Sequence, residues 1–309
     1  GSEMCIRDSM WVATVELALF VFASVSAWFV LKNRNADLFI KLLKPTLLAL
    51  LIVAPLQIYI GDSAGKDVAD TQPTSLAAME GHFHTYLPDG KPNTSWNLIA
   101  IPDVEAGKNL FSIQIPHVLS LLETHTWNGV VKGMDQYPVN ERPDVWVPFY
   151  AFRVMVAIGF ALFFVAIWGN WLRMRGKMNA SELRKHPWFL RAVVFSGFLP
   201  FLAIWGGWWV REIGRQPWVV FGMMRTYEGV SNMGVTQEIV WFVGYIIFEL
   251  VVWSGAWYFF TRVIQKGVND IPHSDTLFQH HSEDHDAAQA GGGHVAPTFA
   301  HKPMMHSDR

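Results

Sequence analysis

Charged side chains stand among tryptophans in residues 207–218, at the end of a long apolar run. Ionisable groups beside the hydrocarbon layer are costly, and they usually serve a ligand, an ion path or a cofactor. Glu212 and Arg215 are three residues apart, which on a helix places both on one face. Pro217 then ends the helix, because its ring blocks the preceding turn and it lacks an N–H. Two interpretations follow: a carboxylate ligand beside a guanidinium, or an interfacial salt bridge within an aromatic belt.

A second pair of candidate side chains, Arg153 and Met155, lies near the start of the apolar run 148–172. An arginine so near the membrane needs a charged partner. A methionine in an apolar helix is either simple packing or a thioether ligand. The pair therefore predicts either ordinary helix packing or the edge of a cofactor site.

Further titratable side chains belong to the polar segment that precedes this run. Glu80 offers a carboxylate that is either a proton-accepting base or an exposed loop acid. His82 and His84 follow it, but the sequence places no third or fourth ligand beside them. We interpret both as surface histidines rather than as a zinc site.

Membrane-spanning helices must hold these side chains. Of the 309 residues, 51% are hydrophobic and only 16% are charged, which is typical of a chain in lipid. Stretches long enough to span hydrocarbon at ~20 residues each are 10–31, 44–60, 148–172, 187–210 and 236–261. The sequence therefore predicts an all-α membrane protein, a polytopic transmembrane helix bundle with five spans.

Charge and cysteine content exclude other classes. The net charge is -2 and no basic patch is present, which argues against a nucleic-acid partner. Cys5 is the single cysteine, so only histidine, methionine and carboxylate remain as metal or haem ligands.

Basic residues follow the first, third and fifth spans, so the positive-inside rule makes those ends cytoplasmic and the first residue external. Residues 10–60 then hold two transmembrane helices, and 148–265 hold three. The acidic segment 61–147 becomes a long external loop, which we expect to be functional and ordered in part. Its residues 110–116 and 118–119 are apolar enough to dock on the membrane face.

The two ends differ from the rest in composition. Residues 1–9 are polar and abut an apolar run without a linker, so we interpret them as an assembly scar. Residues 266–309 are rich in His, Asp, Gly, Ala and Ser, and predict a disordered, solvated cytoplasmic tail.

Three segments, in this order, resemble subunit I of the cytochrome bd-type quinol oxidases. They are Gln72-Pro73-Thr74-Ser75-Leu76-Ala77-Ala78-Met79-Glu80-Gly81-His82, then Phe149-Tyr150-Ala151-Phe152-Arg153-Val154-Met155-Val156, then Gly214-Arg215-Gln216-Pro217-Trp218. The resemblance runs from about residue 10 to about 265. It implies a subunit that spans the membrane nine times, of which this chain resembles the C-terminal five spans. The comparatively short loop resembles the short-loop, cyanide-insensitive branch of the family.

The resemblance also implies an activity. Members oxidise quinol at the outer face, pass electrons through haem b558 and haem b595 to haem d, and reduce dioxygen to water. This chain is then expected to be a fragment of a respiratory terminal oxidase in a bacterial inner membrane, inactive by itself. Expected partners are oxidase subunit II, a small accessory subunit, quinol, dioxygen and the lipid bilayer. Two alternatives stay open: a non-catalytic haem-binding membrane fragment, and a transporter that uses intramembrane charges.

Two residues match iron ligands of the family. Glu212 matches the carboxylate ligand of haem b595, and Met155 matches the thioether ligand of haem b558. The histidine that completes the second ligand pair is expected at about Ser9, and the first histidine of this chain is His82. The ligand of haem d is expected outside this chain.

The remaining site residues are implied by the same motifs. Arg153 and Arg215 are expected at haem propionates, for which a guanidinium fork is well shaped. Trp208 lies four residues before Glu212 and is expected to pack on the macrocycle. Glu80 matches a carboxylate tied to quinol oxidation, whereas the lysine usual five residues earlier is Ser75 here.

Overall fold

The structure is a computed structural model, and it describes residues 2–230 and 233–266. The chain divides into two units, one ending at Val240 and one beginning at Trp241. The predicted tail, from residue 267 onward, lies outside the described residues.

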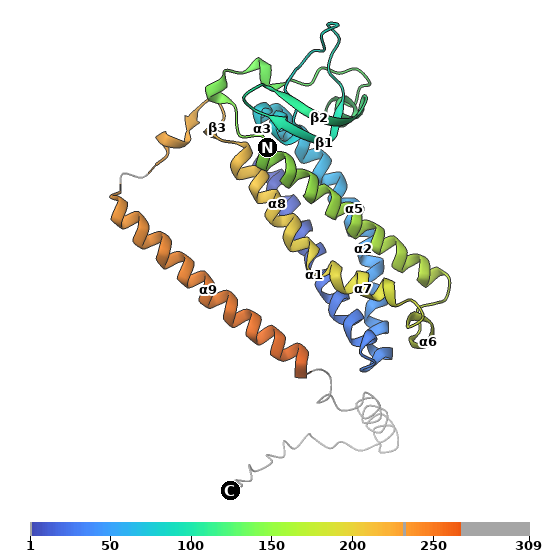
Figure 1. Cartoon of the computed structure of the whole chain (residues 1–309). Coiled ribbons are helices and arrows are strands. Elements are labelled where there is room, and N and C mark those ends of the chain that lie inside the picture. The colour runs from blue at the N-terminus through green and yellow to red at the C-terminus, as the bar shows by residue number, and fades with distance from the viewer. Residues whose placement is uncertain (1, 231–232, 267–309) are drawn as a thin grey trace, which may run out of the picture. The chain divides into compact units, whose positions relative to one another are not determined.

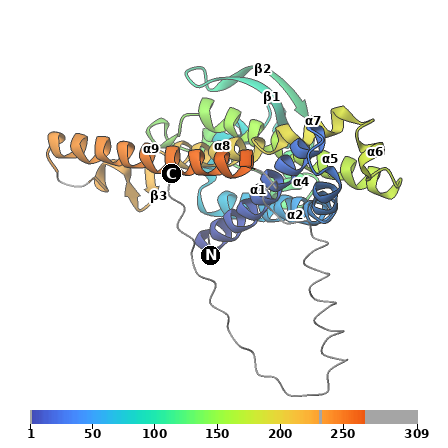
Figure 2. The same cartoon turned by 90° about the horizontal axis from the view of Figure 1, so that it is seen from below.

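The prediction of a membrane helix bundle is confirmed. Within the described residues, five apolar helical stretches are long enough to cross a bilayer. The helices that make them are α1 (Ser2–Leu31), α2 (Ala36–Thr71), α5 (Trp146–Met174), α7 (Pro187–Ser196) with α8 (Leu199–Gly214), and α9 (Val235–Lys266). In the first unit α1, α2, α5, α7 and α8 pack side by side (Figure 1, Figure 2). A short helix, α6 (Ala180–Leu183), joins α5 to α7.

The fourth span is broken into two helices, whereas a single stretch, 187–210, was predicted from the sequence. The break falls between α7 and α8, just before Pro200, which has no N–H to continue the hydrogen-bond ladder. The hydroxyl of Ser24 on α1 donates a 2.7 Å hydrogen bond to the carbonyl of Val194. A Cβ at Gly197 would lie 2.5 Å from the Ser24 Cβ, so the glycine allows α1 to pack tightly at the break.

Helices α1 and α2 extend furthest beyond the predicted spans. Helix α2 continues beyond position 60 to Thr71. The first proline after position 60 is Pro73, which cannot continue α2 and stands at the start of α3. Helix α1 begins at Ser2 and so includes most of the segment interpreted as a scar. No glycine or proline interrupts residues 2–31. The origin of residues 1–9 stays a prediction.

The long loop has its own secondary structure. It contains α3 (Pro73–Glu80), β1 (Trp96–Asp103), β2 (Lys108–Ile115), α4 (Val118–Thr124), and the 3-10 turns η1 (Met134–Gln136) and η2 (Val139–Glu141). Strands β1 and β2 form an antiparallel hairpin. Leu119 on α4 is fully buried, whereas Leu110 and Phe111 on β2 are 65% and 53% exposed. Docking of residues 110–116 on a membrane stays a prediction.

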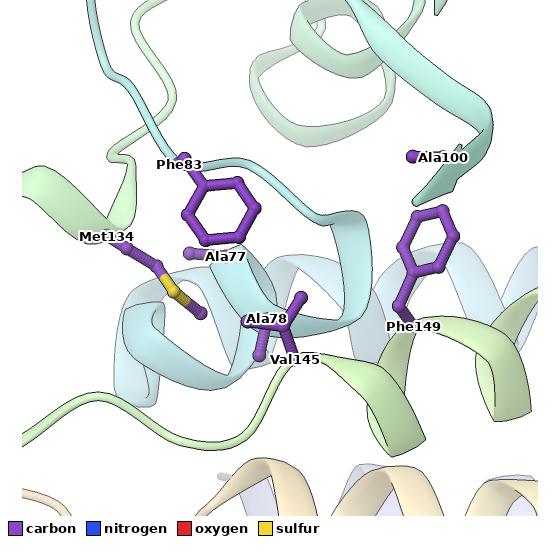
Figure 3. Packing of buried hydrophobic residues seen from close by; sticks show 7 residues of the cluster. All are labelled: Ala77, Ala78, Phe83, Ala100, Met134, Val145 and Phe149. Carbon is purple, nitrogen blue, oxygen red and sulfur yellow. The ribbon is translucent and has the colours of Figure 1, made fainter. Parts of the chain in front are cut away.

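A small apolar core fastens α3 to the start of α5 (Figure 3). Its members lie on or directly beside α3, β1, η1 and α5: Ala77, Ala78, Phe83, Ala100, Met134, Val145 and Phe149. The small Ala77 and Ala78 let the loop approach closely, and the buried Phe149 ring contributes roughly 1.5–3 kcal/mol. This core therefore holds the α3 helix, which ends at Glu80, over the end of the bundle.

A second hairpin follows α8. Strands β3 (Trp218–Val220) and β4 (Met224–Arg225) pair antiparallel and are followed by η3 (Thr226–Glu228). An ion pair of 3.2 Å between Arg225 Nη2 and Glu141 Oε1 joins this hairpin to the long loop. The hairpin that follows α8 is thus joined to the long loop that follows α2.

Candidate functional site

The structure brings Glu80 and Arg153 together. Glu80 is the last residue of α3, which Gly81 ends in the left-handed conformation at φ 58°. Arg153 comes from the second turn of α5. Its Nη2 lies 2.6 Å from Glu80 Oε2, and the two side chains are only 11% and 3% exposed. The charged partner predicted for Arg153 is therefore a carboxylate of this same chain.

Arg153 makes further contacts that fix its guanidinium. Its Nε donates a 2.8 Å hydrogen bond to the carbonyl of Asn97 on β1. The rings of Trp96 and Phe149 lie 4.6 and 4.8 Å from its Cζ, within cation–π range. Its Nη1 is buried and has no hydrogen-bond partner among the described residues. One donor of Arg153 is thus oriented to bind an additional acceptor, such as a propionate or a quinol oxygen.

Burial and the ion pair have opposite effects on the proton affinity of Glu80. Burial raises the pKa of the Glu80 carboxyl above its usual value, and the neighbouring Arg153 charge opposes that rise. A carboxylate with a raised pKa is a better proton acceptor than an exposed one. Glu80 is therefore a buried acid and not the exposed loop acid of the alternative interpretation.

Glu212 and Arg215 pair within one turn of α8. The Nη2 of Arg215 lies 2.6 Å from Glu212 Oε2, and the side chains are 26% and 44% exposed for arginine and glutamate. The Nε of Arg215 is buried without a partner among the described residues. In this structure Glu212 and Arg215 form a salt bridge, which is the second of the two interpretations given for the pair. The partly exposed carboxylate and the unpaired Nε also suit a haem iron and a propionate.

An aromatic side chain lies one turn before this second pair on α8. Trp208, one turn before Glu212, is 44% exposed, and Arg211 lies 5.6 Å over its ring. Helix α8 ends at Gly214, before Pro217, as predicted. A Cβ at Gly214 would lie 2.9 Å from the hydroxyl of Ser75 on α3. The α3 helix of the loop therefore packs directly against the end of the helix that carries Glu212.

Met155 faces α8. Its Sδ lies 3.3 Å from the position that a Cβ would take at Gly207, and its Cβ lies 3.6 Å from that at Gly206. The two glycines give the thioether room at this helix contact. Ser9, where the partner histidine is expected, accepts a 3.3 Å hydrogen bond from Gln57 on α2. Of the two axial ligands implied for haem b558, this sequence supplies Met155 and no histidine before His82.

One interpretation of the histidines is wrong. His82 is not on the surface: it is 1% exposed, and its Nε2 lies 3.2 Å from the carbonyl of Val131. The chain reverses direction at Gly81, and this turn buries His82 against the segment that contains Val131. Burial lowers the pKa of His82, so the ring is held neutral. His84 is exposed as expected, with a 58% accessible side chain 3.9 Å from Asp135.

Sequence reasoning missed a further buried acid, Glu123 on α4. Its Oε2 is buried without a hydrogen-bond partner in the described part of the chain. Burial, followed by the charges of Glu80 and Asp62, raises the pKa of Glu123 to about 7. Its place one turn after the apolar Leu119 was the only sequence signal that it faces inward.

Comparison with known proteins identifies the relatives of this chain. Residues 8–268 match the family model described as cytochrome bd terminal oxidase subunit I. The cytochrome bd ubiquinol oxidase subunit 1 of Bacillus subtilis is 29% identical over 266 residues, covering 83% of this chain and 55% of the relative. The cytochrome bd-II ubiquinol oxidase subunit 1 of Escherichia coli is 26% identical and matches over 76% of this chain and 57% of its own length.

A solved structure agrees with these relatives. The bd oxidase from Geobacillus thermodenitrificans matches with a TM-score of 0.66 and 29% identity, over 82% of this chain and 57% of that chain. The chain thus spans a little more than half the length of the proteins that it matches.

Proposed function

Because this chain belongs to the family of cytochrome bd terminal oxidase subunit I, we propose that it is part of a membrane quinol:dioxygen oxidoreductase, the terminal oxidase of a respiratory chain. The observation that carries the proposal is the buried ion pair between Glu80 and Arg153, at the place where the long loop meets α5. A buried carboxylate beside a fixed guanidinium suits a substrate that must lose protons as it gives up electrons.

Glu80 accepts a proton from a quinol hydroxyl in this proposal. Arg153 holds the Glu80 carboxylate in place through Nη2 and keeps Nη1 free for a further oxygen. Trp96 and Phe149 exclude water from the guanidinium and strengthen its electrostatic effect. Oxidation releases two protons and two electrons for each quinol, so the site must deliver protons outward and electrons into the bundle.

Haem, when bound, supplies the one-electron chemistry that a quinol oxidase needs. Glu212 would hold haem b595 through its carboxylate, and Met155 would give one axial ligand to haem b558. Arg215 would pair with a propionate through its unpaired Nε, and Trp208 would pack against the macrocycle. For Arg153 the observed partner is Glu80, so a propionate would share the guanidinium through Nη1. The ligand of haem d is proposed to lie outside this chain.

The membrane setting follows from the charges that flank the spans. We place the protein in a bacterial inner membrane, with residues 61–147 periplasmic and the C-terminal tail cytoplasmic. Subunit II is the proposed partner, together with a small accessory subunit, quinol, dioxygen and lipid. We expect no oxygen reduction from residues 1–309 alone. The observation that favours the non-catalytic alternative is Ser9 at the place of the expected histidine.

The test uses the complete oxidase complex that contains this chain. Glu80→Gln should lower quinol-driven oxygen uptake by about 100-fold or more, the usual loss for a general base. Oxygen uptake driven by ascorbate with a redox mediator should stay normal, because that route needs no proton-accepting carboxylate. Wild-type quinol turnover in this variant would refute the role of Glu80.

A second variant tests the haem assignment. Glu212→Ala should remove the high-spin b-type signal from the reduced-minus-oxidised spectrum, because the iron loses its carboxylate ligand. Glu105→Ala, at an exposed turn of the loop, is the matched control and should leave the spectrum unchanged. An unchanged high-spin signal in Glu212→Ala would exclude Glu212 as the ligand.

A further inference from the structure

Glu80 cannot pass a proton directly to the outer solution. Its side chain is 3% exposed, and one carboxylate oxygen is bound to Arg153. A proton that Glu80 accepts from quinol therefore needs a second carrier before it reaches water. This argument rests on the proposed function, in which Glu80 is the base.

Helix α4 brings a second carboxylate to the same apolar cluster. Leu119 is fully buried and belongs to one cluster with Leu76 and Met79 of α3, against which Val68 of α2 also packs. Glu123 lies one turn after Leu119 and so shares its face of α4. Glu123 is therefore directed toward α2 and toward α3, the helix that carries Glu80.

Atomic contacts agree with this placement. Glu123 Oε1 lies 3.8 Å from the position of a Cβ at Gly65 on α2, so the absence of a side chain there leaves room for the carboxylate. Glu123 Oε2 is buried and accepts no hydrogen bond within residues 2–230 and 233–266. A buried carboxylate oxygen without a donor is costly, and protonation removes much of that cost.

The groups that face Glu123 favour its protonated form near neutral pH. Burial is the largest cause of its raised pKa of about 7, followed by the negative charges of Glu80 on α3 and Asp62 on α2. Asp70 acts in the same direction, and Lys66 is the opposing cation. Lys66 is itself shared, since it lies 3.2 Å from Asp62 Oδ2 and contacts His125 Nε2. Carriers with a pKa near the working pH both gain and release protons readily.

The outer end of α2 offers the next acceptors. Asp62 is 31% exposed, and Asp70 is exposed to solvent. Both act electrostatically on Glu123 and both reach water. Buried Glu80, half-buried Asp62 and exposed Asp70 thus all lie near enough to Glu123 to act on its charge.

We propose that Glu123 is the proton-relay residue that takes the quinol proton from Glu80 and releases it to the outer solution. In the first step protonated Glu80 and ionised Glu123 become ionised Glu80 and protonated Glu123. In the second step Glu123 loses that proton to water, with Asp62 and Asp70 as surface acceptors. Each step moves one proton, and the electrons leave separately by the haem route of the proposed function.

The experiment compares Glu123→Gln with Glu123→Asp and Glu105→Gln in the complete oxidase complex, reconstituted in vesicles. Turnover is driven by a soluble short-chain quinol, and a pH dye outside the vesicles records proton release. Glu123→Gln should lower turnover by about 10- to 100-fold, leave the KM for quinol unchanged, and remove the titration near pH 7 from the pH profile. Glu123→Asp should restore most of the rate. Glu105→Gln, at an exposed loop position, should behave as wild type.

Failure of this inference is distinguishable from failure of the proposed function. If Glu80→Gln is inactive with quinol while Glu123→Gln matches Glu105→Gln, the relay is refuted and the quinol site stands. If Glu80→Gln keeps full quinol turnover, the quinol site itself is refuted. Haem spectra and mediator-driven oxygen uptake check that Glu123→Gln is folded, and loss of both with the quinol rate would show a structural role and overturn the relay.

Discussion

At the scale of single residues, Glu80 and Arg153 form an ion pair in which both side chains are taken out of water. A charge taken out of water is stabilised only when a partner of opposite sign lies close and the remaining donors are oriented. Arg153 has its partner in Glu80, its Nε is bound to the carbonyl of Asn97, and two aromatic rings lie over the guanidinium, while Nη1 is left for a further acceptor among groups other than the described residues. Each member of the pair therefore depends on the other for its stability in the fold.

Removal of one partner should be more harmful than removal of both. Arg153→Met leaves the Glu80 carboxylate buried and unpaired, and should lower the free energy of unfolding by about 3–5 kcal/mol. The double variant Arg153→Met with Glu80→Gln should recover much of that loss. Thermal unfolding in detergent measures both. At acid pH the unpaired Glu80 carboxylate becomes protonated and neutral, so the free energy of unfolding of the single variant should also recover. An equal loss in the single and double variants would contradict this account.

Glu123 makes stability depend on pH in a defined direction. Its pKa is raised from 4.5 to about 7 by burial and by neighbouring carboxylates, so the folded state holds a proton that the unfolded state has lost. The resulting stabilisation is complete below pH 4.5 and disappears as pH rises through about 7. Glu123→Gln should flatten this slope, removing a pH-dependent contribution of roughly 3.5 kcal/mol at most, at about 1.4 kcal/mol for each pKa unit. Thermal unfolding as a function of pH in both forms is the measurement, and equal slopes would refute the effect.

At the scale of elements, the loop is held by close backbone contacts rather than by apolar surface alone. The chain near Gly133 lies directly against the turn after α3, and a Cβ at Gly133 would be 2.7 Å from the backbone nitrogen of Thr85. The amide of Gly133 donates a 2.9 Å hydrogen bond to the Thr85 hydroxyl. Thr85 in turn donates to Asp135, so one short segment fixes the position of α3.

Two glycine substitutions should have opposite effects. Gly133→Ala places a methyl group against backbone atoms that cannot rotate away, and should destabilise the loop by about 1–3 kcal/mol. Gly61→Ala is the control, since nothing lies within 4 Å of its Cβ position in α2. There the alanine should be neutral or stabilise the helix by up to about 1 kcal/mol. Limited proteolysis of the loop reports the difference, and equal cleavage of both variants would contradict it.

At the scale of the whole molecule, five spans require that consecutive loops alternate between the two sides of the membrane. The long loop and the linker between α5 and α7 then face opposite sides. That linker carries the basic residues Arg173, Arg175, Lys177, Arg184 and Lys185. The loop instead contains acidic side chains and the proposed quinol site.

Cysteine labelling tests this topology. In a background where the single cysteine is replaced by Cys5→Ser, Asp89→Cys in the loop should react with an impermeant maleimide added outside intact cells. Lys177→Cys in the linker should react only after the membrane is opened, because the positive-inside rule places that linker in the cytoplasm. Labelling of both variants in intact cells would refute the assignment of sides.

The number of spans could be predicted from the amino-acid sequence, because the thickness of the hydrocarbon layer sets how many consecutive apolar residues a span needs. It also indicated that Arg153 needs a charged partner and that Glu212 shares a helix face with Arg215, since both follow from charge cost and helical spacing. Only the tertiary structure decided that the partner of Arg153 is Glu80, 73 residues earlier in the chain. No local pattern encodes a contact of that separation.

Tertiary structure likewise decided which polar residues are buried. His82 and Glu123 stand in a segment of polar composition, which predicts exposure, yet a turn at Gly81 and the packing of Leu119 carry them inward. The pairing of β1 with β2 likewise could not be predicted from local pattern, whereas the break before Pro200 could have been, because proline lacks the N–H that continues a helix. Burial depends on which elements meet, and that depends on packing across the whole fold, whereas helix periodicity and span length are properties of the local chain.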